Sequence, residues 1–315
     1  RNFFSPLKAR EAYLRFVFFT GITKFSQVSI FSELNNVTNI SMYDEYAGML
    51  GITKEELSGQ LSEDIEVLAT KMHLTKEQTL GKLTENYDGY HFSAYSPDVF
   101  NPYSLFNCFA QGKLGSYWFG SGTPTYLINM MRKYDVLPTG ITRVEADESE
   151  FDAPTEDMTT LMPLLYQSGY LTIKDYNRDY NYYTLDIPNK EVKIGLTKAL
   201  IPSYVTGNTL ATTNTARRIA QALDKQDMDG ALHLLQEFLG TVPYCNVTNH
   251  EGHYQQMLFI IFSLLTDYLV DVEVHTPKGR VDVVLLTGTD LYIIELKLDK
   301  SAQAAMQQIN LKNYR

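Results

Sequence analysis

The chain has 315 residues, 44% of them hydrophobic, which is enough material for two or three packed domains. Its formal net charge is −10, which excludes a protein that grips nucleic acid through a generally basic surface, because phosphate binding relies on lysine and arginine. Any contact with nucleic acid must therefore come from a local patch or from residues outside this sequence.

Targeting signals are absent from the sequence. The longest apolar run, residues 257–265, is much shorter than a bilayer requires, and no cleavable apolar segment follows the basic residues near the start. The two cysteines, Cys108 and Cys245, lie far apart and match two reduced thiols. We therefore expect a cytoplasmic protein without a membrane contact. Because the chain begins with arginine rather than methionine, we expect a fragment of a longer protein.

The first 132 residues predict an aromatic-rich α/β region. Residues 15–20 form an apolar run that predicts a short buried strand. Thr53 with Glu56, and Thr75 with Gln78, have the spacing of capping boxes, which predicts that helices start there. Further helices are expected over residues 64–72, 101–109 and 124–132, a turn over 87–92, and a loop or short helix over 26–34.

The middle of the chain predicts a helix, a β-hairpin and a second helix. The helices are expected over residues 155–168 and 191–204, and the strands over 170–174 and 182–187. This order is typical of a winged-helix module, which can read DNA or serve only for packing. Basic residues are sparse here, so packing is favoured. Residues 206–240 predict a helical connector, with helices over 215–223 and 229–238.

The last part of the chain alternates a helix with strands. Apolar residues at three- and four-residue steps predict one buried helix over 251–269. Strands are expected over residues 272–275, 280–286 and 291–297. The last two are apolar on both faces, so we expect them in the centre of a mixed sheet that helices cover.

Three ionisable residues lie on these two strands. Asp282 shares a strand face with Val284, while Glu295 and Lys297 share a face of the next strand. Two carboxylates can hold Mg²⁺ or Mn²⁺ through oxygen ligands, and a lysine nearby can orient a metal-bound water. The alternative is an ordinary surface ion pair between Glu295 and Lys297. Burying unpaired charges in an otherwise apolar strand would be costly. This cost favours a metal-binding site over an ordinary ion pair.

The same residues carry a family resemblance. Residues 279–282 (Gly-Arg-Val-Asp) and 293–297 (Ile-Ile-Glu-Leu-Lys) resemble the core motif of the PD-(D/E)XK nuclease superfamily, with Val281 in place of the proline. The resemblance implies an αβββα core over 241–315 that stops before its last strand. It also implies Glu251 as a further metal ligand and Gln308 as a further catalytic residue, with Gln307 as second choice.

A second resemblance extends upstream. Segments at 18–26, 30–36, 51–53, 87–92, 101–104 and 183–192 resemble an AAA-ATPase-like family that is fused to this type of nuclease in bacteria, especially gut Bacteroidetes. It implies that residues 1–132 are the C-terminal part of an AAA-like domain and that 133–205 form the winged-helix-like module. No phosphate-binding loop of the form GxxxxGKS or GxxxxGKT occurs, so we expect that this fragment neither binds nor hydrolyses ATP.

The sequence thus predicts a multi-domain α/β protein that cleaves phosphodiester bonds with Mg²⁺ or Mn²⁺. Asp282, Glu295, Lys297 and Gln308 are the expected catalytic residues, and nucleic acid, DNA rather than RNA, is the expected partner. An ATPase-like region would regulate this activity. The alternative is a non-catalytic regulatory or interaction protein that keeps the nuclease-like fold. The two hypotheses, a nuclease and a non-catalytic protein, differ in whether Asp282, Glu295 and Lys297 lie close together.

Overall fold

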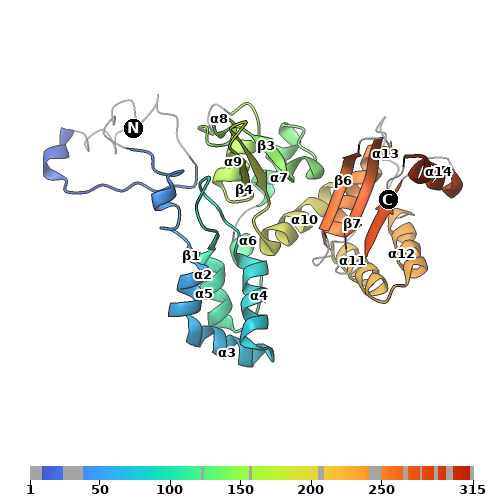
Figure 1. Ribbon diagram of the computed structural model, residues 1–315, viewed down its shortest axis with the longest axis horizontal. Helices are drawn as coiled ribbons and strands as arrows, with labels where there is room; N and C mark the ends of the chain where they lie inside the picture. Colours follow the sequence, from blue (N-terminus) through green and yellow to red (C-terminus); the bar gives the residue numbers. More distant parts are fainter. Residues whose placement is uncertain are drawn as a thin grey trace. The chain divides into compact units, whose positions relative to one another are not determined.

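The computed structural model describes ten stretches of the chain. They are residues 9–23, 38–121, 124–155, 158–204, 209–240, 250–264, 269–276, 279–286, 290–295 and 301–312. The chain divides into two compact units (Figure 1). The first comprises Arg1–Thr123, Asn129–Val136 and Ile141–Val192, and the second comprises Pro124–Ile128, Leu137–Gly140 and Lys193–Arg315.

The first unit begins with a helical layer. Its elements are η1 (Glu11–Tyr13), η3 (Asp44–Tyr46), β1 (Ile52–Thr53), α2 (Lys54–Gln60), α3 (Ser62–Met72), α4 (Lys76–Tyr87), β2 (Val99–Phe100), α5 (Pro102–Gln111) and α6 (Trp118–Ser121). Both predicted capping boxes are confirmed, at the starts of α2 and α4. Asn101 caps α5 in a similar way, because its Oδ1 accepts a hydrogen bond from the main-chain N–H of Ser104 at 3.2 Å. These local signals fix where the helices start.

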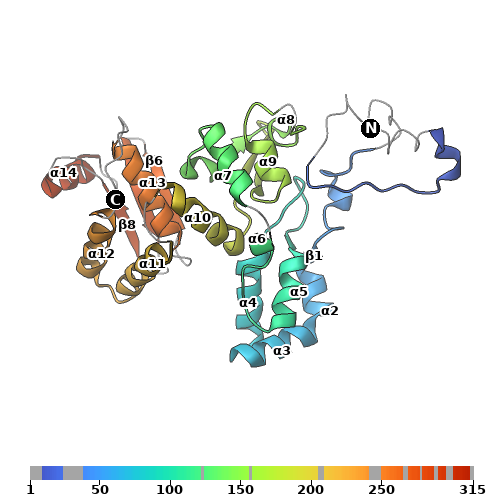
Figure 2. The same ribbon diagram turned by 180° about the vertical axis from the view of Figure 1, so that it is seen from behind.

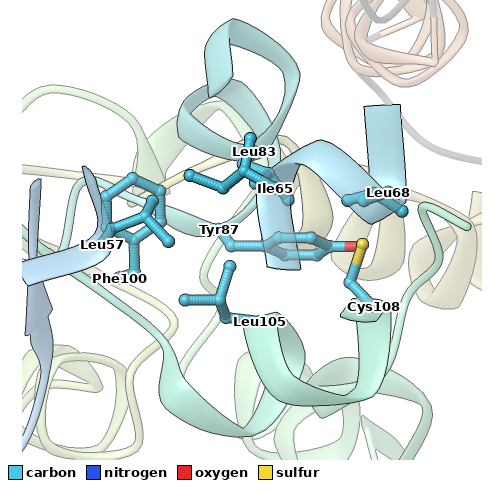
Figure 3. Close-up of a cluster of buried hydrophobic side chains, with 8 residues drawn as sticks. All are labelled: Leu57, Ile65, Leu68, Leu83, Tyr87, Phe100, Leu105 and Cys108. Atoms are coloured by element: carbon cyan, nitrogen blue, oxygen red, sulfur yellow. The ribbon is translucent and has the colours of Figure 1, made fainter. Parts of the chain in front are cut away.

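The helices of this layer enclose an apolar core. Side chains from α2, α3, α4, β2 and α5 converge on the buried ring of Tyr87 (Figure 3). The cluster consists of Leu57, Ile65, Leu68, Leu83, Tyr87, Phe100, Leu105 and Cys108. The hydroxyl of Tyr87 donates to the main-chain oxygen of Gly115 at 2.9 Å, so the one polar atom of this ring is satisfied.

The strand predicted over residues 15–20 is wrong. These residues belong to no strand, and the side chains of Phe16, Val17 and Phe18 are exposed. A strand gains its stability from a hydrogen-bonded neighbour, and no strand of the described chain pairs with this segment. The prediction over residues 26–34 falls outside the described residues.

A three-stranded antiparallel sheet follows in the first unit, in the order β3-β5-β4. It consists of β3 (Val144–Ala146), β4 (Thr172–Asn177) and β5 (Tyr182–Asp186), with α8 (Glu148–Phe151) and α9 (Met162–Gln167) between β3 and β4 in the chain. The predicted hairpin is confirmed and β3 was not predicted. The predicted helix over 155–168 is wrong in its start, because Pro163 is tolerated only in a first turn.

Helices α7 (Pro124–Lys133) and η4 (Pro138–Ile141) precede β3 along the chain, and the predicted helix at 124–132 is confirmed. The second unit then contains α10 (Lys190–Tyr204, mostly in this unit), α11 (Thr209–Asp224), α12 (Met228–Gly240), α13 (His250–Ser263), β6 (Leu269–Thr276), β7 (Gly279–Leu286), β8 (Leu291–Ile294) and α14 (Ala302–Lys312). Helices α11 and α12 pack together, as the predicted helical pair requires.

The sheet of the second unit has the order β6-β7-β8. Both strand pairs are antiparallel, so the prediction of a mixed sheet is wrong for the described strands. Helix α13 packs against β6 and β7 (Figure 2). The helix predicted over 251–269 ends at Ser263, because Leu269 already pairs with Leu286 across the sheet. Here strand pairing outweighs the local helical pattern.

The sequence of elements in this part of the unit is helix, three strands, helix, as predicted. The finer division into an AAA-like part, a winged-helix-like module and a connector stays a prediction. In the part of the chain that the structure describes, no helix has both the length and the apolar character that a membrane span requires. The cytoplasmic location also stays a prediction.

Candidate functional site

The register of β7 and β8 bears on the predicted pair of carboxylates, Asp282 and Glu295. Val283 pairs with Ile294 and Val284 with Ile293. Continued by one residue beyond the last paired position, this register sets Asp282 opposite Glu295. Residues directly opposite each other in an antiparallel pair project to the same face, with Cβ atoms about 4.5–5.5 Å apart. If the register continues past Ile294, Asp282 and Glu295 lie on one face of the sheet, as the sequence predicts.

Strand β7 separates its two faces strictly. Val281, Val283 and Leu285 are buried on the face toward α13, whose residues from Met257 to Phe262 are buried as well. Asp282 projects to the other face. That face is open at its far end, where Leu286 and Leu291 are exposed. The prediction that both faces are covered is therefore wrong at this end of the hairpin.

Asp282 is nevertheless only 5% exposed, although it lies on the more open face. Strand β8 ends at Ile294 rather than at Lys297, so Glu295 directly follows the strand. Glu295 is half-buried and its Oε2 atom is buried. Both carboxyl groups thus have limited access to water.

The remaining predicted site residues are less well placed. Lys297 lies outside the described residues, and so does the side chain of Glu251, whose main chain is in α13. Gln308 is half-buried in α14, while its neighbour Gln307 is exposed. The structure therefore describes Asp282 and Glu295 at the same end of the β7–β8 pair, and the meeting of their carboxylates, like the positions of Lys297 and Gln308, stays a prediction.

Oxygen donors of this kind suit a hard divalent cation such as Mg²⁺ or Mn²⁺. Asp282 and Glu295 supply two such donors. Among the residues that the structure describes, no group of three or more His, Cys, Asp or Glu side chains is close enough to hold a metal ion. The predicted third ligand is Glu251 on α13, whose side chain lies outside the described residues.

Helix α13 is fixed by a residue that the sequence analysis missed. Gln256 is buried, its Nε2 donates to Thr139 Oγ1 at 2.9 Å, and its Oε1 accepts from the Thr139 main-chain N–H at 3.2 Å. A glutamine beside a strongly apolar run is the only local signal for this contact. Its partner lies 117 residues away in the chain, so the pairing itself has no local signal.

A buried carboxylate in the first unit was also missed. Glu191 is 3% exposed, and its carboxylate accepts hydrogen bonds from Ser104 Oγ at 2.6 Å and from the Trp118 main-chain N–H at 2.7 Å. Burial raises the pKa of Glu191, and these hydrogen bonds offset the rise only in part. Ser104 and Glu191 are 87 positions apart in the chain, so no local sequence pattern indicates that they meet. The arrangement ties α10 to α5 and α6 and has no open access.

Comparison with known proteins assigns the class of the C-terminal domain. Residues 249–315 match the profile of the PD-(D/E)XK nuclease superfamily, so the chain ends in a domain of this superfamily. The matched range contains α13, the three strands of the second sheet and α14, and it includes both Asp282 and Glu295.

The whole chain is also similar to a curated protein. It is 28% identical over 323 residues to the "Uncharacterized protein in vnfD 5'region" of Azotobacter chroococcum mcd 1, covering 100% of this chain and 60% of the relative. The chain therefore spans less than two thirds of that relative's length. No solved structure matches the chain. The resemblance of the upstream segments to AAA-like ATPases stays a prediction.

Proposed function

We propose that the C-terminal domain hydrolyses phosphodiester bonds of nucleic acid with a bound divalent cation, Mg²⁺ or Mn²⁺. The observation that supports the proposal is the β7–β8 register, which, continued by one residue, would set Asp282 opposite Glu295 inside a domain of a nuclease superfamily. Asp282 and Glu295 would hold the cation, with Glu251 as the further ligand.

The electrostatics of the pair support this assignment. Two adjacent carboxylates repel each other, and the repulsion grows as they lose contact with water. A divalent cation between them offsets the repulsion. When bound, such a cation supplies a water of lowered pKa and stabilises charge on the phosphoryl oxygens. In the proposal Lys297 orients that water, and Gln308 contacts the substrate.

The substrate and the regulation are further parts of the proposal. We take DNA rather than RNA as the first substrate to test. The upstream region, which resembles an AAA-like ATPase, would control the nuclease when its phosphate-binding segment is present. If the site binds no cation and cuts nothing, the domain is instead a regulatory or interaction module with a nuclease-like fold.

The metal site is tested by thermal unfolding of Asp282→Asn. At an ion concentration about ten times its Kd, Mg²⁺ or Mn²⁺ should stabilise the wild-type fold by about 1.4 kcal/mol, or roughly 3–6 °C in Tm. Asp282→Asn should abolish this shift, because it removes one ligand charge. Asp290→Asn is the matched control: it removes a carboxylate at the opposite end of the same hairpin and should keep the shift.

Catalysis is tested separately with Lys297→Ala. This variant should keep the metal-dependent Tm shift, since the lysine is not a ligand, but it should lose about 10²–10³-fold in the rate of DNA cleavage. The assay should use this chain with DNA and either Mg²⁺ or Mn²⁺. Cleavage at the wild-type rate by Lys297→Ala would refute the assignment of these residues to a nuclease site. An unchanged Tm shift in Asp282→Asn would show that the metal binds elsewhere, and Glu251 would then be the next ligand to test.

A further inference from the structure

Five tyrosines lie on three neighbouring segments of the first unit, far in sequence from the nuclease motif, and four of them have exposed side chains. We call Tyr43, Tyr46, Tyr95, Tyr176 and Tyr180 the tyrosine patch. They come from three segments, residues 43–46, 93–98 and 175–182, the last of which contains the β4–β5 turn. Tyr180 is 78% exposed and Tyr95 is 59% exposed. Large aromatic side chains at this level of exposure are typical of binding surfaces.

The patch is anchored in the core by a continuous series of ring contacts. The buried ring of Phe151 contacts Tyr183 at 5.3 Å between centroids, and Tyr183 contacts Tyr176 at 4.7 Å. Tyr176 in turn meets Tyr95 edge-on at 6.0 Å. Tyr176 and Tyr183 are also direct partners across the β4–β5 pair. The exposed ring of Tyr95 is therefore connected through Tyr176 and Tyr183 to the buried ring of Phe151.

Hydrogen bonds fix the segments that carry the rings. The main-chain N–H groups of Asp179 and Tyr180 both donate to Asn177 Oδ1, at 3.1 Å each. Tyr176 donates its hydroxyl to Asn181 Oδ1 at 2.8 Å. The main-chain N–H of Tyr95 donates to Asp44 Oδ1 at 3.3 Å, which joins two of the segments. A surface ordered in this way loses little entropy when it binds a partner.

The charge around the rings selects the partner. The three segments contain five carboxylates, those of Asp44, Glu45, Asp98, Asp175 and Asp179, and one basic residue, Arg178. Such a surface repels phosphate, which disfavours nucleic acid. A second copy of the chain would bring two acidic faces together, which is unfavourable in a symmetric contact. The surface is complementary to positive charge.

One cation–π contact within the chain illustrates how a basic side chain can bind these rings. The guanidinium of Arg178 lies over the Tyr95 ring, 5.3 Å from its centroid, and its Nε donates to the Tyr95 hydroxyl at 3.0 Å. The rings of Tyr43, Tyr46 and Tyr180 present exposed surface to other cations.

We propose that the tyrosine patch is a docking surface for a basic segment of a partner protein. Arginine or lysine side chains of that segment stack on the exposed rings and pair with the carboxylates beside them. Binding of this kind combines cation–π contacts, which resist salt, with ion pairs, which salt weakens.

The test uses a synthetic arginine-rich peptide as the probe, with binding measured by fluorescence anisotropy at 0.15 M salt. The double variant Tyr43→Ala/Tyr180→Ala should bind the peptide about tenfold more weakly than the wild type, from the loss of two cation–π contacts. Tyr43→Phe/Tyr180→Phe keeps the rings and should retain most of the affinity. Asp179→Asn should weaken binding, and more so at low salt.

Two controls separate the patch from the general acidity of the chain. Tyr103→Ala removes an exposed tyrosine on α5, outside the patch, and should bind like the wild type. Asp229→Asn removes an exposed carboxylate on α12, also outside the patch, and should bind normally as well. Equal affinity of the wild type and the double alanine variant would overturn the proposal. So would oligothymidylate binding that the same double variant abolishes, since the patch would then bind nucleic acid.

Discussion

Burial gives the Glu191 carboxyl group properties that the exposed carboxylates of the chain do not share. Desolvation raises its pKa, while the hydrogen bonds from Ser104 and from the main-chain N–H groups of Phe119 and Trp118 lower it by less. Its folded-state pKa therefore lies above its unfolded value. The native state binds this proton more tightly than the unfolded chain does, so the stability contribution is full below the unfolded pKa and is lost as pH rises through the folded pKa.

We predict that Glu191→Gln removes this pH dependence. The free energy of unfolding of the wild type, relative to Glu191→Gln, should fall as pH rises from about 4.5, the ordinary value for glutamate, through the raised pKa. Urea unfolding at a series of pH values measures it. Glu191→Ala is the contrasting variant: it leaves Ser104 Oγ and the Trp118 N–H without their acceptor and should cost about 2–4 kcal/mol. A constant difference between wild type and Glu191→Gln across this range would contradict the assignment.

At the scale of elements, the turn after α4 depends on a close approach of two main-chain segments. Lys174 Nζ donates to the main-chain oxygens of Gly89 and Pro188, at 2.8 and 3.0 Å. Asn189 Nδ2 donates to the main-chain oxygen of Asp88 at 3.0 Å. Strand β4 and the start of α10 are thus held to this turn. Gly89 has φ of +88°, and a Cβ atom there would lie 2.5 Å from the Pro188 oxygen.

We predict opposite effects for two glycine substitutions. Gly89→Ala should destabilise the first unit by about 2 kcal/mol or more, because it combines a positive φ with a clash against main chain. Gly81→Ala, in the exposed interior of α4, should stabilise it by about 0.5–1 kcal/mol, because nothing lies within 4 Å of the new Cβ and alanine favours the helix. Urea unfolding of both variants tests the pair. If both variants changed the free energy of unfolding in the same direction and by a similar amount, Gly89 would not have the structural role in the turn that we assign to it.

For the whole molecule, the relevant features are the two compact units, the net charge of −10 and the missing phosphate-binding loop. An acidic chain does not attract polyphosphate without a local basic or main-chain site. The resemblance to an ATPase family therefore does not imply nucleotide binding by these 315 residues.

We predict that calorimetric titration with Mg-ATP at millimolar concentrations gives no saturable nucleotide binding. Titration with MgCl₂ alone is the control, since the proposed nuclease site binds the cation and its heat must be subtracted. One saturable site per chain that requires ATP would show that these residues hold a complete nucleotide site.

The sequence by itself determined the features whose energetics are local. Thr53 and Glu56, three residues apart, satisfy each other's main-chain groups, so the start of α2 could be predicted without any tertiary information. The β4–β5 hairpin and the alternation along β7 follow in the same way from patterns of neighbouring residues. This alternation placed Asp282 on the face opposite to Val281 and Val283.

Tertiary structure decided the features that depend on pairing between distant segments. Only the register of β7 and β8 set Val283 opposite Ile294, and only pairing with Leu286 placed Leu269 in a strand rather than in the preceding helix. Residues 15–20 have a strong local tendency to form a strand but no neighbour among the described strands to pair with. Ser104 and Glu191 meet across 87 residues. In each case the free energy comes from hydrogen bonds and burial supplied by a remote segment, which no local pattern encodes.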